Sequence, residues 1–247
     1  GPLFRSNAKI MDNLKKSNIS FSDEDRNKII ENMWGNYGRI LSEYMFLRQF
    51  RKNNLNSFLE IRGLNFLEEI KKQNEQAVFI SGHFNNFELM AMTIEKAGIN
   101  LSAIYRPLNN PFLNIVMERL RKKYICKNQI KKGKSGTRNL LNLLKQNVSV
   151  ALMIDQRVTE GELINFFNRQ ARTTTIPAQI SKKYGYRIVP VYIERFNKVH
   201  FKLSIEKPIK FDHKLSIEQI SLELNKILER MILKNPDQWI WSHDRWK

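Results

Sequence analysis

The 247-residue chain is long enough for one well-buried domain or, at most, two small ones. Its hydrophobic fraction of 42% and aromatic fraction of 11% are typical of a globular protein and exclude a disordered chain. A single cysteine, Cys126, excludes an intramolecular disulfide framework and a zinc site with several thiolates. Four scattered histidines without a His-x-x-x-His pair argue against a structural metal.

The charge balance is strongly basic, with 42 Lys and Arg against 24 Asp and Glu and a formal net charge of +18. This excess indicates an anionic partner, which is nucleic acid, an anionic lipid surface or an acidic protein. The alternative is a solvated surface encoded by an AT-rich genome, since Lys, Asn and Ile are all frequent. No apolar run reaches about 18 residues, so no span is predicted. Because the chain opens Gly-Pro-Leu without Met, we expect a processed or trimmed chain that can lack an N-terminal anchor.

The N-terminal third has helical patterning. Apolar residues recur at helical spacing from about Asp23 to Arg51, after a start signal at Ser22-Asp-Glu-Asp25. A second helix is predicted over Ile61–Gln73.

Strands and helices then alternate along the rest of the chain. Strands are predicted over Ala77–Ser81, Leu101–Tyr105, Val148–Ile154, Arg187–Glu194 and His200–Glu206, and helices over Phe84–Ala97, Asn110–Lys123, Thr137–Gln146 and Ser216–Leu233. This order predicts an α/β fold with a central, mostly parallel mixed sheet flanked by helices. No repeat or linker divides the chain, so we expect a single domain over 1–247, with a helical N-terminal arm over about 1–73 and an α/β core over about 77–247.

The most informative segment is Ser81-Gly82-His83-Phe84-Asn85-Asn86-Phe87-Glu88. It places His83 where the carboxyl end of a predicted strand meets a helix, which is where ligands bind in open α/β sheets. Histidine takes up a proton near neutral pH, and a carboxylate can fix its tautomer. Residues five apart on one helix point about 140° apart, so Glu88 can reach His83 only if His83 lies in the preceding turn. The alternative is a histidine that only caps a helix, with Glu88 facing solvent.

Three further blocks follow this motif. They are Tyr105-Arg106-Pro107-Leu108-Asn109-Asn110-Pro111, then Asp155-Gln156 with Gly161 and Phe166-Phe167, and finally Pro236-Asp237-Gln238-Trp239-Ile240-Trp241-Ser242-His243-Asp244-Arg245-Trp246.

Together the four blocks, which extend over nearly the whole chain, resemble the late acyltransferases of lipid A biosynthesis. This is the lauroyl and myristoyl transferase group within the lysophospholipid acyltransferase superfamily. The family pattern Gly-His-Phe-Gly-Asn-Trp-Glu is similar to residues 82–88, with Asn85 in place of Gly and Phe87 in place of Trp. Asn168 replaces the glycine that follows Phe-Phe, and Asn is the residue after Gly that best tolerates left-handed backbone geometry.

The resemblance implies a glycerolipid acyltransferase-like fold and a set of site residues. His83 is the expected general base and Glu88 the carboxylate that orients it. Positive charge for the oxyanion is expected from Arg119 or Arg121, with Arg119 preferred, and Arg106 and Asp155 are expected to bind substrate or stabilise the site. For Asp155 the alternative is a helix cap or an ordinary ion pair. No cofactor and no metal are expected for this chemistry.

The resemblance therefore implies an O-acyltransferase at the cytoplasmic face of the bacterial inner membrane. It moves a fatty acyl chain from acyl carrier protein to a hydroxyl of a lipid A precursor, so its expected partners are that donor, the anionic glycolipid and the membrane surface. The alternatives are a related acyltransferase that uses acyl-CoA or another glycolipid, a catalytically silent lipid-binding protein, and a basic nucleic-acid-binding protein. The last lacks a recognised binding motif, so no nucleic acid is expected as a partner.

Overall fold

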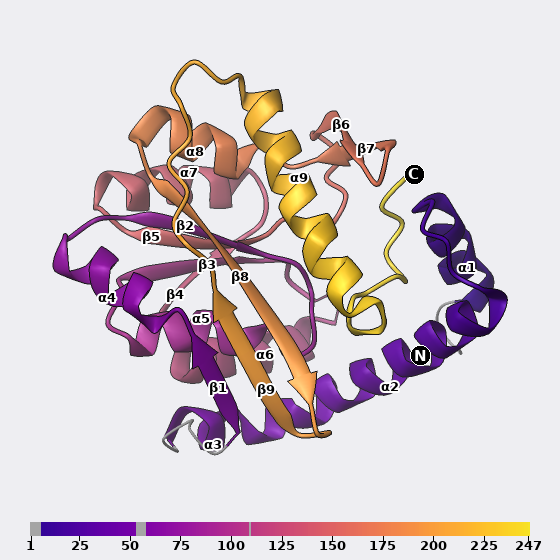
Figure 1. Cartoon of the computed structure of the whole chain (residues 1–247). Coiled ribbons are helices and arrows are strands. Elements are labelled where there is room, and N and C mark those ends of the chain that lie inside the picture. Colours follow the sequence, from indigo (N-terminus) through magenta and orange to yellow (C-terminus); the bar gives the residue numbers. More distant parts are fainter. Residues whose placement is uncertain (1–5, 53–57, 109) are drawn as a thin grey trace.

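A computed structural model describes residues 6–52, 58–108 and 110–247 (Figure 1). The helices are α1 Asn7–Lys16, α2 Asp23–Glu43, α3 Leu47–Lys52, α4 Leu64–Lys72, α5 Glu88–Lys96, α6 Pro111–Tyr124, α7 Lys134–Lys145, α8 Ile176–Tyr184 and α9 Ile217–Lys234. The strands are β1 Leu59–Arg62, β2 Ala77–Ser81, β3 Leu101–Tyr105, β4 Asn128–Lys131, β5 Ser149–Met153, β6 Glu162–Phe166, β7 Arg169–Thr173, β8 Arg187–Phe196 and β9 His200–Ile205.

The central sheet has seven strands in the order β1-β9-β8-β2-β5-β3-β4. Every neighbouring pair is parallel except β8 and β9, which run antiparallel. All five residues of β2 are buried, as expected for a central strand of a parallel sheet with helices on both faces. The predicted α/β class with a central, mostly parallel mixed sheet is therefore confirmed.

Two long helices frame the sheet. Figure 1 shows α9 lying across one face and α2 passing the point at which β8 ends. Helix α2 contacts β8 through an ion pair between Glu43 and Arg195 and a hydrogen bond from Arg195 to Asn36. The carboxyl ends of the parallel strands β8, β2, β5, β3 and β4 therefore lie at the edge of the sheet that α2 borders.

Several element boundaries differ from the sequence-based expectation. The helix predicted from Asp23 begins with a capping box between Ser22 and Asp25, but a 3₁₀ turn at Tyr44–Phe46 interrupts it. The helix predicted over 84–97 begins only at Glu88, and the helix predicted over 61–73 begins at Leu64 because strand β1 precedes it.

Strand β1 pairs with β9 near the other end of the chain, so the N-terminal arm is not wholly helical. The division of a single domain into an arm and a core stays a prediction. In the described part of the chain, no helix is both long enough and apolar enough to cross a membrane.

Candidate active site

His83 and Asp155 meet because they follow neighbouring parallel strands. β2 ends at Ser81 and β5 ends at Met153, and these two residues are directly opposite each other in the sheet. Each functional residue comes two positions later, so both side chains emerge at the same edge. His83 Nδ1 lies 2.7 Å from Asp155 Oδ1, and the His83 amide donates to Asp155 Oδ2 at 2.8 Å. The carboxylate thus fixes both the ring and the backbone of His83.

Asp155 is held as a buried anion. Its side chain is 2% exposed, and it also accepts a hydrogen bond from Trp239 Nε1 at 2.9 Å. Burial by itself raises the pKa of this carboxyl, but the charge of His83 and the hydrogen bonds from His83 and Trp239 outweigh burial and lower the pKa to about 2. An ionised Asp155 accepts a hydrogen bond from His83 Nδ1, so Nε2 is the ring nitrogen left for proton transfer.

The turn that contains His83 requires a residue without a side chain at one position and a left-handed backbone at another. A Cβ atom on Gly82 would lie 2.8 Å from a ring carbon of Phe84, whose side chain is fully buried, so Gly82 is required for space. Asn85 has φ +42°, at the position where the family pattern has glycine. Asn168 has φ +57° at the other replaced glycine. Asparagine therefore keeps left-handed geometry at both positions.

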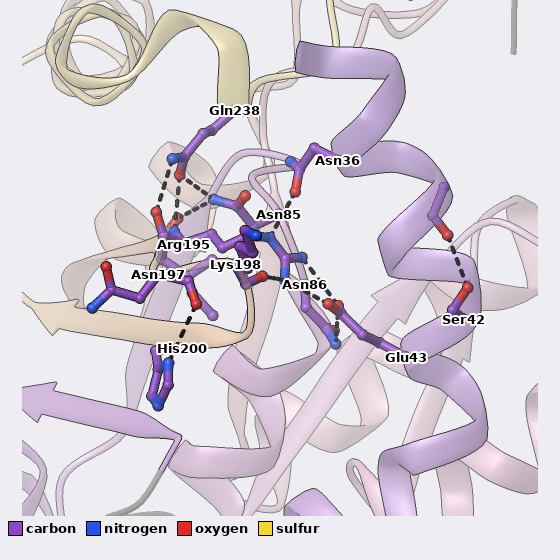
Figure 2. Close-up of polar contacts among 12 residues, drawn as sticks. Asn36, Ser42, Glu43, Asn85, Asn86, Arg195, Asn197, Lys198, His200 and Gln238 are labelled. Carbon is purple, nitrogen blue, oxygen red and sulfur yellow. Dashed lines mark hydrogen bonds and ion pairs between the residues drawn. The ribbon is translucent and has the colours of Figure 1, made fainter.

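A buried polar cluster fixes the rest of this turn (Figure 2). Asn85 Nδ2 donates to the Ile193 carbonyl at 3.1 Å and to Gln238 Oε1 at 2.6 Å. Asn86 Nδ2 donates to Glu43 Oε2 at 3.0 Å, and Glu43 in turn pairs with Arg195. The turn is thereby joined to helix α2, to strand β8 and to the C-terminal segment.

Arg195 is the centre of that cluster. Its Nη1 lies 2.5 Å from Glu43 Oε1, its Nε donates to Asn36 Oδ1 at 2.9 Å, and its guanidinium lies 4.4 Å from the centre of the Phe201 ring. Figure 2 shows Glu43 and Asn36 reaching it from α2, while Gln238 reaches it from above. The N-terminal helix is therefore a structural part of the site.

Glu88 does not orient His83, which corrects the sequence-based expectation. As the first residue of α5, Glu88 is buried and accepts hydrogen bonds from Arg121 Nε at 2.8 Å and from the Tyr44 hydroxyl. Arg121 Nη2 lies 2.6 Å from the same carboxylate oxygen. The carboxylate at Nδ1 is Asp155, because β5 brings it there, whereas the first turn of α5 directs Glu88 towards α6 and α2.

The Glu88–Arg121–Tyr44 group is a second, separate charged unit. Burial opposes the charge of Arg121, but the attraction of Glu88 outweighs it and raises the pKa of the guanidinium. Burial, followed by the charge of Glu88, raises the pKa of Tyr44 well above its usual range, so its hydroxyl stays a donor. Phe87, directly before Glu88, packs against the other unit, since the centre of its ring lies 4.8 Å from that of the His83 ring.

The other predicted cations lie outside this unit. Arg119 is exposed on α6, so of the two candidate arginines the structure brings Arg121, and not Arg119, to Glu88. Arg106 is exposed directly after β3, and Lys132 directly after β4. Tyr105 and Lys131 pair in register at the ends of these strands, so Arg106 and Lys132 lie side by side at the same sheet edge as His83. Partial burial and the charge of Arg106 lower the pKa of Lys132.

The C-terminal signature contacts the site through Trp239. Trp239 bonds Asp155, and its ring packs at 4.7 Å against Trp241. Arg245 is fully buried, where it donates to the Arg172 carbonyl and to Thr173 Oγ1 at 2.6 and 2.8 Å. His243 Nε2 accepts a hydrogen bond from the Arg157 amide at 3.0 Å. Among the described residues, no cluster of His, Cys, Asp or Glu could hold a metal ion.

Three residues that contribute to the site were not predicted from the sequence, namely Glu43, Tyr44 and Arg195. Tyr44 stood in an apolar helical stripe, and Glu43 and Arg195 lie 152 positions apart, so no local pattern marks their contacts. Trp239 did carry a signal, because it belongs to the C-terminal signature, but its hydrogen bond to Asp155 depends on the tertiary fold.

Comparison with known proteins agrees with the sequence motifs. The family model described as bacterial lipid A biosynthesis acyltransferase matches residues 3–247. The lipid A biosynthesis palmitoleoyltransferase of Escherichia coli (strain K12) is 24% identical over 230 residues, which cover 92% of this chain and 74% of that protein. The lauroyltransferase of the same organism is 23% identical over 243 residues, covering 95% and 77%. The Shigella flexneri lipid A biosynthesis acyltransferase 2 is 23% identical over 228 residues, covering 89% and 71%.

A more distant similarity is structural. The crystal structure of the 1-acyl-sn-glycerophosphate acyltransferase PlsC from Thermotoga maritima superimposes with a TM-score of 0.46 and 13% identity, over 92% of this chain and 88% of that one. The match of the family model over nearly the whole length decides the family, and the chain belongs to the bacterial lipid A biosynthesis acyltransferases.

Proposed function

We propose that this chain transfers a fatty acyl group from an acyl carrier protein thioester to a hydroxyl of a lipid A precursor, with His83 as general base and Asp155 as the residue that positions it. The observation that carries the proposal is the 2.7 Å contact between His83 Nδ1 and the buried Asp155. This contact occurs in a chain whose family transfers acyl groups in lipid A biosynthesis.

The arrangement supports direct transfer. With Nδ1 engaged by Asp155, His83 Nε2 removes the proton of the acceptor hydroxyl as its oxygen attacks the thioester carbonyl. Collapse of the tetrahedral intermediate breaks the carbon–sulfur bond, and His83 returns the proton to the departing thiolate. His83 is 20% exposed, so substrate can reach the ring, whereas Asp155 is shielded from water.

Arg121 is the proposed source of positive charge for the intermediate. It is buried, permanently charged and held by Glu88 and Tyr44, so its charge is in place before substrate binds. Glu88 then acts through Arg121. Substitution of Glu88 should therefore leave the Arg121 guanidinium without its partner, whereas the His83 imidazole keeps its contact with Asp155.

The acceptor is proposed to be an anionic glycolipid, bound in part by Arg106 and Lys132. These exposed cations are neighbours at the edge of the sheet where His83 lies, and the charge of one already disfavours the charge of the other. A phosphate group between them would relieve that repulsion. Arg119 is proposed to attract substrate from the surface, and the acidic donor would be attracted by the net charge of +18.

The site of action is proposed to be the cytoplasmic face of the inner membrane, where both carrier protein and precursor are available. The assay that tests the function compares acyl carrier protein thioesters of several chain lengths with the matching acyl-CoA esters, using a tetra-acylated lipid A precursor as acceptor. We expect ester formation with the carrier-protein donors. Faster transfer from acyl-CoA, or transfer only to other glycolipids, would support the related-acyltransferase alternative instead.

A further inference from the structure

Large apolar side chains are exposed on the first half of α6. Phe112 is 81% exposed, and Ile115 and Val116 are about half exposed on the next turn. Exposure of large apolar side chains to water is unfavourable. A helix that exposes several of them therefore indicates a surface that contacts a partner.

A second exposed apolar set lies at the end of α2 and in the 3₁₀ turn that follows it. Met45 is 77% exposed, and Leu41 and Phe46 are also exposed. The elements that carry the two sets are in contact, because Tyr44, next to Met45, bonds Arg121 on α6. We call Leu41, Met45, Phe46, Phe112, Ile115 and Val116 the exposed apolar patch.

Exposed cations lie on α2 and α6, which carry the patch, and on α3, which directly follows the 3₁₀ turn. Arg39, Arg48 and Arg119 are exposed, as are Lys122 and Lys123 on the last turn of α6. The acidic residues nearby are already neutralised, since Glu43 pairs with Arg195, Glu88 with Arg121 and Glu118 with Lys131. Exposed apolar residues with interspersed Lys and Arg are typical of helices that lie in the interface of an anionic bilayer.

We infer that the exposed apolar patch inserts into the headgroup region of an anionic phospholipid bilayer. This inference rests on the proposed function, because a glycolipid acceptor is held in such a surface. The charge complementarity favours an anionic bilayer over a second copy of this basic chain, which would repel it.

Flotation with lipid vesicles tests the inference. We expect the wild-type chain to bind vesicles that contain phosphatidylglycerol at least tenfold more tightly than vesicles of phosphatidylcholine alone. The double variant Met45→Ser/Phe112→Ser should lose at least tenfold in binding to the anionic vesicles. The matched control Leu163→Ser/Val199→Ser removes two exposed apolar residues elsewhere, of 60% and 53% exposure, and should bind within about twofold of wild type.

Three results would overturn the inference. One is equal loss of binding in the control, and another is binding by the double variant as tight as that of wild type. The third is a wild-type dimer in gel filtration that the double variant lacks, because the patch would then be covered by a second copy.

Activity measurements separate this inference from the proposed function. With a detergent-dispersed acceptor, the double variant should retain wild-type acyl transfer, and with the acceptor embedded in vesicles it should lose most of it. Wild-type binding to vesicles without acyl transfer in either assay would contradict the proposed function alone. Equal activity of the double variant in both assays would contradict the docking surface alone.

Discussion

Because Asp155 is held as an anion, the stability of the folded protein should depend on pH. The pKa of Asp155 in the folded protein is about 2, below the ordinary value of 3.8, so this residue stabilises the fold above pH 3.8 and that contribution disappears as the pH falls to about 2. The shift corresponds to about 2 kcal/mol. The free energies of unfolding of wild type and Asp155→Asn, measured by denaturation between pH 5 and pH 2, should converge as the pH falls. Parallel curves would show that Asp155 is not held as an anion.

Cys126 is a second residue whose role the structure constrains. It is a free, buried thiol, and burial raises its pKa to about 11, which leaves little of the nucleophilic thiolate. We expect no covalent acyl-enzyme when the protein is incubated with donor thioester alone, and intact-protein mass spectrometry checks this. An added acyl mass that disappears in Cys126→Ser would instead establish a two-step route.

The position of an individual residue was predictable where one strand end determines it. His83 and Asp155 both follow apolar runs that the sequence marks as strands, although only the strand order makes them neighbours. Glu88 was assigned to the wrong partner, because proximity in sequence suggested His83 while Arg121, 33 positions away, completes the contact.

At the scale of elements, the Glu43–Arg195 pair should hold α2 against the sheet. Both side chains are largely buried, at 14% and 6% exposure. Arg195→Met leaves the Glu43 carboxylate without its cation and should lower the free energy of unfolding by about 3 kcal/mol. The double variant Glu43→Leu/Arg195→Met should recover much of that loss. Chemical denaturation measures both, with Arg62→Ala, which breaks an exposed pair with Glu60, as the control that changes little.

A double variant less stable than Arg195→Met alone would contradict this account of α2. It would mean that the hydrogen bond from Asn86 to Glu43, which Arg195→Met leaves in place, stabilises the fold more than the unpaired carboxylate destabilises it.

Elements with strong periodicity were predicted correctly, whereas β1, β4, the β6–β7 hairpin and α8 were missed, α8 despite a proline in its first turn and Gly185 at its end. Strands β2 and β3 match their predicted bounds because buried apolar runs end at Gly82 and Arg106. The β6–β7 hairpin was missed because its two-residue turn is Phe167-Asn168, both with positive φ, rather than the usual Asn-Gly. Strand β1 was missed because it is short and finds its partner, β9, only in the folded chain.

For the whole molecule, the charge of +18 should speed the encounter with acidic partners. The Debye length falls from about 10 Å at 0.1 M salt to about 3 Å at 1 M, so kcat/KM should fall as salt rises while kcat changes less. Arg119→Ala should raise KM and flatten this salt dependence, whereas Arg121→Ala should lower kcat. Steady-state kinetics at several salt concentrations measure both effects. Rates indifferent to salt would mean that the charge reflects genome composition.

The global class, a mostly parallel α/β sheet, was predictable because strands and helices alternate along the sequence. The position of the N-terminal segment was not, since Glu43 at the end of α2 pairs with Arg195 on β8 and Tyr44 after it bonds Arg121 on α6, and local patterns do not mark these contacts. The parts of the site that depend on long-range contacts were therefore visible only in the structure.

The central claim is that His83 and Asp155 act as one catalytic unit, and a double-mutant cycle on kcat tests it most directly. His83→Ala and Asp155→Asn should each lower kcat by roughly two to four orders of magnitude, and the double variant should be little worse than His83→Ala, because Asp155 acts only through the histidine. Near-normal turnover in a folded His83→Ala protein, or losses that multiply in the double variant, would contradict the claim.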